Sequence, residues 1–326
     1  MLVATFAALT LAAVTPAAPV VMPGGASGVG FDDIFFSPAL GKVLIPSAKT
    51  GNLNLIDPKT QSVETISGFS TEPMAGGHGA GSTSADFGAG FVFASDRGHR
   101  QLVVVDPSTR QIVARQDLAA GPDYVRFVEP SGEVWVTEPR NRAIEVFKLE
   151  KSPKVALTHV ADIKVDDGPE SLAVDPPRGR AYAHSWKDTT YVIDLAKHAV
   201  VAQWKNGCTG ARGIALDPQR ALLFVGCDEG KATALDVAHD GAKRGEAKSG
   251  KGVDIIAYAP ALHRLYVPGG DEATLTVMSV GDKGELQALQ TLPTAEDAHC
   301  AAVDDRGNAY VCDPKKGRML VFHDAP

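Results

Sequence analysis

The sequence has few of the features that mark several large classes of protein. Aromatic residues make up only 6% of it, the formal net charge is only -7, and its basic residues are scattered rather than gathered into a stripe that would suit a phosphate backbone. Beyond the first residues, no apolar stretch approaches the roughly 18 residues of a membrane-spanning helix. We therefore expect no nucleic-acid partner and no membrane span.

Several active-site motifs are also missing. The sequence contains no Gly-rich phosphate loop, no Gly-x-Ser-x-Gly elbow and no Cys-x-x-Cys-His haem attachment site. None of the 4 cysteines has the Cys-x-x-Cys spacing of a zinc site. These absences disfavour nucleotide, serine-hydrolase and c-type cytochrome chemistry.

What the sequence does contain is a repeated pair of strands. In Gly132–Phe147 an apolar run, Val134–Val136, precedes a polar break and then the alternating residues Ile144 and Val146, which predicts two strands and a turn. The pattern occurs seven times, at 42–57, 90–106, 132–147, 180–194, 221–236, 264–280 and 308–324. A period of about 40–45 residues is typical of a propeller with one four-stranded blade per repeat. We predict an all-β fold, a seven-bladed β-propeller.

The last repeat lacks the residues for its fourth strand. After Met319–His323 only three residues remain, and an unpaired sheet edge promotes aggregation. Pro19–Met22 stands directly before the first blade. The outer strand of blade 2 stands in the same position before blade 3. We predict that an N-terminal strand from about Ala18 closes the ring beside Met319–His323.

Residues 1–17 have the composition of a secretory signal peptide, although no Lys or Arg precedes the apolar run. Residues 2–14 are uncharged and apolar, and Thr15–Ala18 supplies small residues for cleavage. A buried N-terminal strand without export is the alternative. The first interpretation predicts a leader at 1–17, a single propeller domain at 18–326 and a periplasmic or secreted location.

The cysteines form two pairs that are close in sequence. Cys300 and Cys312 flank a tight turn at 304–307, and Cys208 and Cys227 flank a hairpin around Pro218. Two disulfides would suit an oxidising compartment. Four buried free thiols are the alternative, because spacing alone does not prove a bridge.

Three of the repeats resemble the YVTN-type seven-bladed propellers of bacterial surface and periplasmic proteins. The resemblance is carried by 134–138 (Val-Trp-Val-Thr-Glu), 265–269 (Leu-Tyr-Val-Pro-Gly) and 309–313 (Ala-Tyr-Val-Cys-Asp). No copy has the complete Tyr-Val-Thr-Asn, so the related propellers of NHL-repeat proteins, SMP-30-like gluconolactonases and streptogramin lyases also fit. The resemblance implies the fold and no single function.

In a propeller the innermost strands line a central channel, and equivalent residues of each blade converge at its mouth. One residue per blade falls at this position: Asp32, Tyr124, Glu170, Arg212, Asp254 and His299, with blade 2 represented near Ser82. The ends of the second strands add a rim of Asp96, Glu138, His184, Asp228 and Asp313. We predict a polar funnel that binds a ligand.

Two more residues on this face are candidate ligand contacts. Trp186, beside His184, is placed to stack on a sugar or an aromatic group, with packing over the channel as the alternative. His78 lies in a Gly-rich stretch at 74–84, where the backbone can approach a ligand closely. The remaining histidines are expected at the solvated surface.

Three functions remain open for the funnel. The first is a monomeric binding protein that holds a small polar molecule, a cation or a partner protein's peptide. The second is a lactonase or lyase that uses a divalent cation, Ca²⁺, Mg²⁺ or Mn²⁺, with Asp32, Glu170, Asp254 and His299 as its ligands. The third is a structural surface protein without a site.

Overall fold

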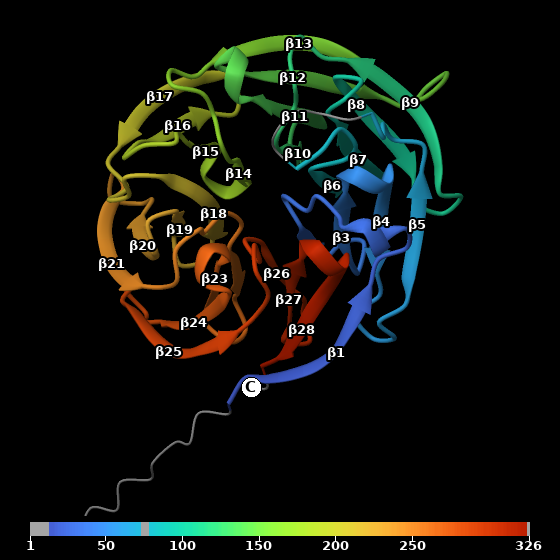
Figure 1. The fold of residues 1–326 in the computed structure, drawn as a ribbon. Helices are drawn as coiled ribbons and strands as arrows, with labels where there is room; N and C mark the ends of the chain where they lie inside the picture. The colour runs from blue at the N-terminus through green and yellow to red at the C-terminus, as the bar shows by residue number, and fades with distance from the viewer. Residues whose placement is uncertain (1–12, 73–77, 325–326) are drawn as a thin grey trace, which may run out of the picture.

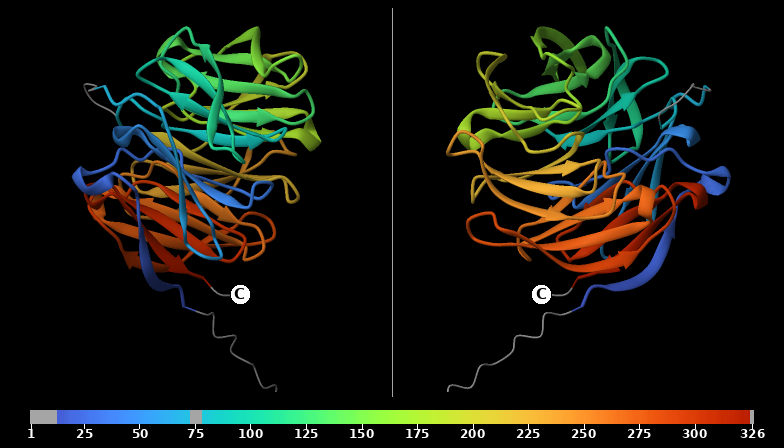
Figure 2. Two further views of the ribbon diagram at one scale, coloured as in Figure 1. Left: turned by 90° about the vertical axis from the view of Figure 1, so that its right-hand side faces the viewer. Right: turned by 60° about the vertical axis from the view of Figure 1, so that its left-hand side comes forward.

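The computed structural model describes residues 13–72 and 78–324, and these form seven β-sheets arranged in a ring (Figure 1). Each sheet has four antiparallel strands, and successive sheets follow chain order around the ring. Viewed from the side, the blades pack face to face about the central axis (Figure 2). The predicted seven-bladed β-propeller is confirmed.

The strands run outward from the channel in chain order within each of blades 1 to 6. Those of blades 1 and 2 are β2 (Phe35–Ser37), β3 (Lys42–Ser47), β4 (Asn52–Ile56), β5 (Val63–Ser67), β6 (Ala85–Gly88), β7 (Phe91–Asp96), β8 (Gln101–Asp106) and β9 (Gln111–Asp117). Those of blades 3 and 4 are β10 (Val125–Val128), β11 (Glu133–Glu138), β12 (Ala143–Glu150), β13 (Ala156–Lys164), β14 (Ala173–Asp175), β15 (Arg180–His184), β16 (Thr190–Asp194) and β17 (Ala199–Trp204). Those of blades 5 and 6 are β18 (Ala211–Asp217), β19 (Leu222–Cys227), β20 (Lys231–Asp236), β21 (Ala242–Lys248), β22 (Ala257–Ala259), β23 (Arg264–Gly269), β24 (Thr274–Val280) and β25 (Leu286–Pro293).

Blade 7 takes its strands from both ends of the chain. They are β26 (Ala301–Val303), β27 (Asn308–Asp313), β28 (Arg318–His323) and β1 (Thr15–Val21). The helices are short 3-10 turns at η1 (Gly25–Ser27), η2 (Ala48–Thr50), η3 (Pro139–Asn141), η4 (Pro176–Arg178), η5 (Gly270–Glu272) and η6 (Pro314–Lys316). None of the helices in the described residues is long and apolar enough to cross a membrane.

Burial along the strands explains the sequence pattern. All six residues of β11 are buried, because this strand has a neighbour on each side within its sheet and another blade against its faces. The outermost strand β9 alternates between exposed and partly buried residues, because one of its faces meets solvent. The second strand of each repeat is therefore the clearest sequence signal of a blade.

Pairing between β1 and β28 closes the ring. The register runs antiparallel from Thr15 opposite His323 to Val21 opposite Arg318, so closure by the N-terminal strand is confirmed. The strand begins at Thr15, earlier than the expected start at Ala18. Val14 is buried just before it and exchanges two hydrogen bonds with the Gln290 side chain of blade 6, at 3.0 and 3.2 Å. The predicted leader lies mostly outside the described residues, and its cleavage stays a prediction.

Both predicted cysteine pairs are bonded. Cys208 joins Cys227 with a Cα–Cα distance of 5.3 Å, and Cys300 joins Cys312 with a Cα–Cα distance of 5.6 Å. Both distances lie in the usual range for disulfides. The described part of the chain has no free cysteine, and the two bridges fit an oxidising compartment.

A chain that begins at Ala18 should be less stable than one that begins at Val14. The shorter chain loses the pairing of Thr15–Ala17 and the burial of Val14, which alone stabilises by roughly 1.5–3 kcal/mol. We expect a melting temperature lower by about 3–6 °C, measured by circular dichroism. Val21→Thr in the longer chain is the control, because this side chain is mostly exposed. Equal melting temperatures for the two chains would contradict the role given to these residues.

Candidate functional site

Charged side chains from all seven blades lie at one mouth of the channel. Most stand just before the innermost strand of their blade, at the place where a closed ring brings equivalent positions together. The group consists of Asp32, His78, Arg97, Asp123, Glu170, Arg212, Asp254 and His299. Its contacts define three clusters that share carboxylates.

Arg97 links two carboxyl groups from neighbouring blades. Its guanidinium donates to Asp123 at 2.6 Å and to the Pro122 carbonyl at 3.3 Å, and it lies 3.6 Å from Asp32. Burial, with a smaller contribution from Asp254, raises the pKa of Asp123 to about 6, although Arg97 acts to lower it. Burial and the Asp123 carboxylate raise the pKa of Asp32 well above its ordinary value. A single Arg therefore does not neutralise this crowding of carboxylates.

Glu170 and Arg212 form a second cluster. The guanidinium of Arg212 donates to Glu170 at 2.9 Å and lies over the ring of Trp186, 5.9 Å from its centroid. Burial and the carboxylates of Asp123 and Asp254 raise the pKa of Glu170, and Arg212 offsets only part of that rise. The Trp186 side chain is 42% exposed, so it is available to a ligand.

His78 lies between two further carboxylates. Its Nε2 is 3.8 Å from Asp32 Oδ2 and 3.8 Å from Asp254 Oδ2. Burial lowers the pKa of His78 to about 4, so the imidazole is neutral at pH 7. Gly30 positions this segment, since a Cβ added at Gly30 would lie 1.4 Å from the His78 carbonyl oxygen. Residues 74–77 of the Gly-rich stretch lie outside the described residues.

His299 is held as a cation. Nδ1 lies 2.6 Å from the Asp297 carbonyl and Nε2 lies 3.2 Å from the Phe31 carbonyl, so both nitrogens donate. Burial alone would lower the pKa of His299, but Asp297 and the Asp254 carboxylate raise it to about 9. Its ring lies 5.0 Å from that of His78. One neutral and one charged imidazole thus share this side of the mouth.

A separate, buried group of charged residues lies behind the mouth, between the blades. Arg126 makes a bidentate contact with Asp33, at 2.6 and 2.9 Å, and Ser84 donates to the same carboxylate at 2.6 Å. Asp33 also forms a parallel bridge with Ser84 of blade 2. All three side chains are buried, so we assign this cluster to holding blades 1, 2 and 3 together.

The structure brings five of the six aligned residues into direct contact with the clusters. Tyr124 is buried, and its ring packs 5.0 Å from the Arg126 guanidinium, while its neighbour Asp123 accepts a hydrogen bond from Arg97. Sequence alignment therefore placed blade 3 one residue too late. It also missed Arg97, whose only signal was its position directly after the rim residue Asp96.

Most of the expected rim residues have structural roles instead. Asp96 accepts from the Ser70 backbone, Glu138 from the Ala120 backbone and Asp313 from the Lys316 backbone. His184 is fully buried in blade 4, with Nδ1 3.0 Å from Thr190 Oγ1. Among these residues Asp228 alone is exposed at the rim.

The predicted metal ligands are not all brought together at the mouth. Atoms of His78, Asp254 and His299 lie within 4.8 Å of one another, close enough to surround an ion. However, both nitrogens of His299 donate to carbonyl oxygens, so neither presents a lone pair to a metal. Glu170 is paired with Arg212 in another cluster. The four predicted ligands therefore do not form one coordination sphere.

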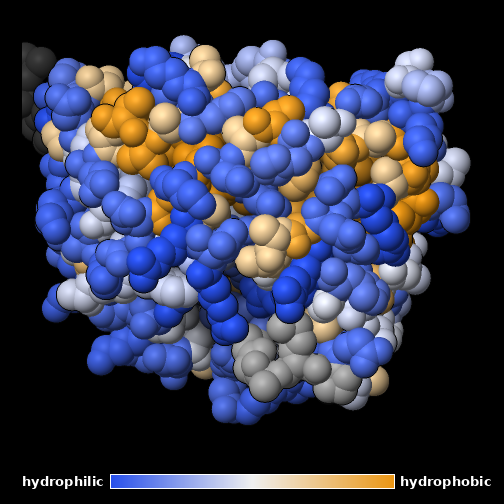
Figure 3. Space-filling view, turned by 90° about the horizontal axis from the view of Figure 1, so that it is seen from above, coloured by the Kyte–Doolittle hydropathy of each residue, from blue (hydrophilic) through white to orange (hydrophobic). Residues whose placement is uncertain are grey.

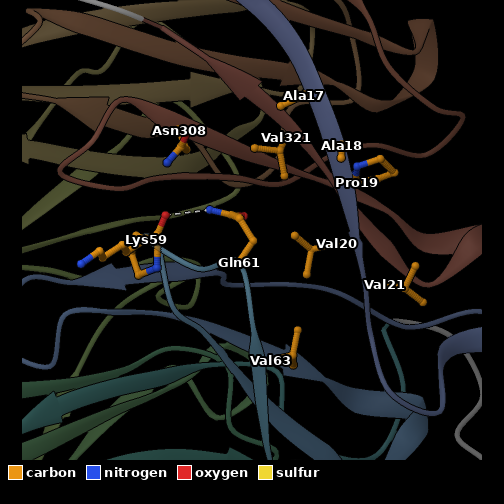
Figure 4. A pocket seen from close by; sticks show the side chains of 11 residues that line it. Ala17, Ala18, Pro19, Val20, Val21, Lys59, Gln61, Val63, Asn308 and Val321 are labelled. Atoms are coloured by element: carbon orange, nitrogen blue, oxygen red, sulfur yellow. Dashed lines mark hydrogen bonds between the residues drawn. The ribbon is translucent and has the colours of Figure 1, made fainter.

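A groove on the outer wall is a separate feature. It has a volume of about 550 Å³ and lies beneath β1, lined by Val20, Val21, Val63 and Val321 among others (Figure 4). Within it Gln61 donates to the Pro58 carbonyl at 2.8 Å. The groove carries none of the charged residues of the mouth, so the mouth is the candidate site.

Comparison with known proteins identifies the fold. No family model matches the sequence, and no curated protein is similar to it. Among solved structures, a chain from "Crystal Structure of Mitotic Checkpoint Complex" has a TM-score of 0.79 at 12% identity, covering 99% of this chain and 96% of that one. A chain of Kuenenia stuttgartiensis hydrazine synthase has a TM-score of 0.72 at 14% identity, covering 92% and 96%. These likenesses show the fold alone. The YVTN-type resemblance stays a prediction.

His299 should make stability depend on pH. Because its pKa is raised from 6.5 to about 9, its contribution is fully present below pH 6.5 and is lost as pH rises toward 9. We expect the free energy of unfolding of the wild type to exceed that of His299→Gln most at pH 6 and least at pH 9.5, measured with urea. His78 is neutral over this range and does not contribute. A difference that stays constant or grows with pH would refute a charged His299.

Proposed function

We propose that this protein is a binding module whose channel mouth takes a positively charged group. The group is an ammonium or guanidinium, carried by a small molecule or by a Lys or Arg side chain of a partner protein. β-Propellers commonly serve as scaffolds for protein interactions. We also propose that the protein is exported, because the two disulfides suit an oxidising compartment.

The observation that carries the proposal is the pair of carboxylates around His78. Asp32 and Asp254 both point at the same neutral nitrogen from 3.8 Å, which is too long for a hydrogen bond. Neither carboxylate accepts a hydrogen bond within 3.5 Å from the residues that the structure describes. An ammonium group provides the donors that these oxygens lack.

The balance of charge supports the same ligand. The mouth holds four carboxyl groups, on Asp32, Asp123, Glu170 and Asp254, and three cations, on Arg97, Arg212 and His299. Burial is the largest cause of the raised pKa values of Asp32, Asp123 and Glu170, and repulsion from neighbouring carboxylates raises them further. A bound cation offsets the repulsion between carboxylates, whereas an anion increases it.

Trp186 supplies a second contact for such a ligand. Its ring is partly exposed and already lies beneath the Arg212 guanidinium. Cations are attracted to the face of an indole ring, and the attraction grows where water is excluded. A ligand with a cationic head and an extended body can therefore contact the carboxylates and the ring together.

A divalent-cation site is the second candidate, because His78, Asp254 and His299 lie close enough to hold an ion. It requires one nitrogen of His299 to give up its carbonyl partner. His78 would be the other nitrogen ligand, so binding of a metal at the mouth would depend on it. The two candidate functions differ in the ligand that binds.

Binding of a simple amine tests the proposal. Melting temperatures are measured with n-butylamine or methylguanidinium, with malonate, and with Ca²⁺, Mg²⁺ and Mn²⁺, at matched ionic strength. We expect the organic cations alone to stabilise the wild type, by about 2.7 kcal/mol at 100 times the dissociation constant. Asp254→Asn and Asp32→Asn should remove most of this gain, and Asp228→Asn, an exposed carboxylate at the rim, should not.

The pH profile gives an independent check. Because the pKa of Asp32 is raised, its carboxylate takes up a proton as pH falls, and affinity for a cation should fall with it. Stabilisation by malonate that Arg212→Ala abolishes would indicate an anionic ligand. Stabilisation by a metal that His78→Ala abolishes would indicate the second candidate. Either result, or no shift with any compound, would overturn the proposal.

A further inference from the structure

Three side chains with metal-binding atoms lie together on the outer part of blade 3, away from the channel mouth. Glu145 lies on β12, and His159 and Asp162 lie on the outermost strand β13. Glu145 and Asp162 are paired across the two strands, and His159 Nε2 is 2.9 Å from Asp162 Oδ1. One atom from each residue lies within 4.8 Å of the others. Figure 3 shows the wall on which β13 lies, where hydrophilic and apolar groups are mixed.

A β-bulge places His159 on the same face of the sheet as Asp162. Val146 pairs with Ala161 and Phe147 pairs with His159, so Val160 has no partner in the register. Residues three apart on a regular strand point to opposite faces, and the extra residue restores them to the same face. The ring of Phe147, 5.5 Å from the imidazole and perpendicular to it at 74°, limits its rotation.

The bulge itself belongs to the fold rather than to this site. Similar register shifts occur between the two outer strands of blades 2, 4, 5 and 6. Blade 3 differs in the residues that it places around the bulge. The arrangement of the three side chains is thus a property of the sequence of blade 3.

Two other His–Asp pairs differ from the pair on blade 3, because an Arg lies near their carboxylate. His99 contacts Asp96 at 3.0 Å and His239 contacts Asp236 at 2.9 Å, with the same spacing of three residues. In those pairs an Arg lies near the carboxylate, Arg115 at 3.5 Å and Arg244 at 2.7 Å.

No such Arg or Lys is present on blade 3. Across residues 13–72 and 78–324, neither Asp162 nor Glu145 has a Lys or Arg nitrogen within 4.0 Å. Glu138, which also interacts with Glu145, accepts from the Ala120 backbone and the Asn141 amide, each at 2.8 Å. The carboxylates of the cluster therefore have no Lys or Arg partner among the described residues.

We infer that Glu145, His159 and Asp162 bind Zn²⁺, with water completing the coordination. One nitrogen and two carboxylate oxygens suit zinc better than Ca²⁺, which takes six to eight oxygens. Ligands about 2.0–2.1 Å from a tetrahedral zinc ion lie about 3.3 Å apart, so the 2.9 Å contact between His159 and Asp162 needs only slight widening. Solvent reaches the site, because the side chains of His159 and Asp162 are 43% and 47% exposed.

Isothermal titration with ZnCl₂ tests the site on protein first treated with a chelator. We expect the wild type to bind one Zn²⁺ ion here, and His159→Ala and Glu145→Gln to weaken that binding at least tenfold. His239→Ala is the matched control, because it removes an equally spaced His–Asp pair that an Arg already neutralises, and it should bind as the wild type does. Circular dichroism melts of all variants establish that they are folded.

His78→Ala separates this site from the channel mouth, where His78, Asp254 and His299 also lie close together. The inference predicts that His78→Ala binds Zn²⁺ as the wild type does. Loss of zinc binding in His78→Ala with retention in His159→Ala would overturn it. Equal weakening in His159→Ala and His239→Ala, or no zinc binding to the wild type, would also overturn it.

Discussion

The pairing of β1 with β28 is the interaction on which the rest of the structure depends. It joins residues from the two ends of the chain, and it gives blade 7 the outer strand that its own sequence lacks. An open ring would leave the edge of blade 7 unpaired and would remove the packing of blade 7 against blade 1. Because the mouth is assembled from residues of all seven blades, its geometry depends on this ring being closed.

Ring closure has an electrostatic consequence at the mouth. Side chains that are far apart in the sequence are forced together in a partly desolvated space, where like charges repel strongly. Two Arg side chains and a protonated His299 offset much of this repulsion. The carboxylates of Asp32 and Asp254 are left without hydrogen bonds from the described residues, so their oxygens are open to a ligand.

The periodic features of the fold could be predicted from the sequence. Strands such as β11 are buried on both faces, so they appear in the sequence as continuous apolar runs. The last repeat was too short for four strands, so it required a strand from the other end of the chain. The spacing of the cysteines suggested both disulfides without proving them, and Cys208 lies in the loop before β18, since Cys227 itself pairs with Ala211. The start of β1 at Thr15 was missed, since Thr15–Ala17 also has the small residues of a cleavage site.

The contacts of the site were less predictable than its position. Alignment of the repeats placed Asp32, Glu170 and Asp254 at the mouth, because equivalent positions converge in a ring. Arg97 reaches across to the neighbouring blades through a long side chain, and no repeat pattern encodes that reach. The location of His78 depends on close backbone packing against Gly30, a contact between segments that only the folded chain reveals.

The central claim is that Asp32 and Asp254 together hold a cationic group at the mouth of the channel. A crystal structure of the protein soaked in methylguanidinium tests it most directly. The account predicts the planar cation between these two carboxylates, beside a neutral His78, with Arg97 still paired to Asp123. A mouth in which the soaked cation is bound elsewhere, or in which an anion lies against Arg212 and displaces Glu170, would contradict it.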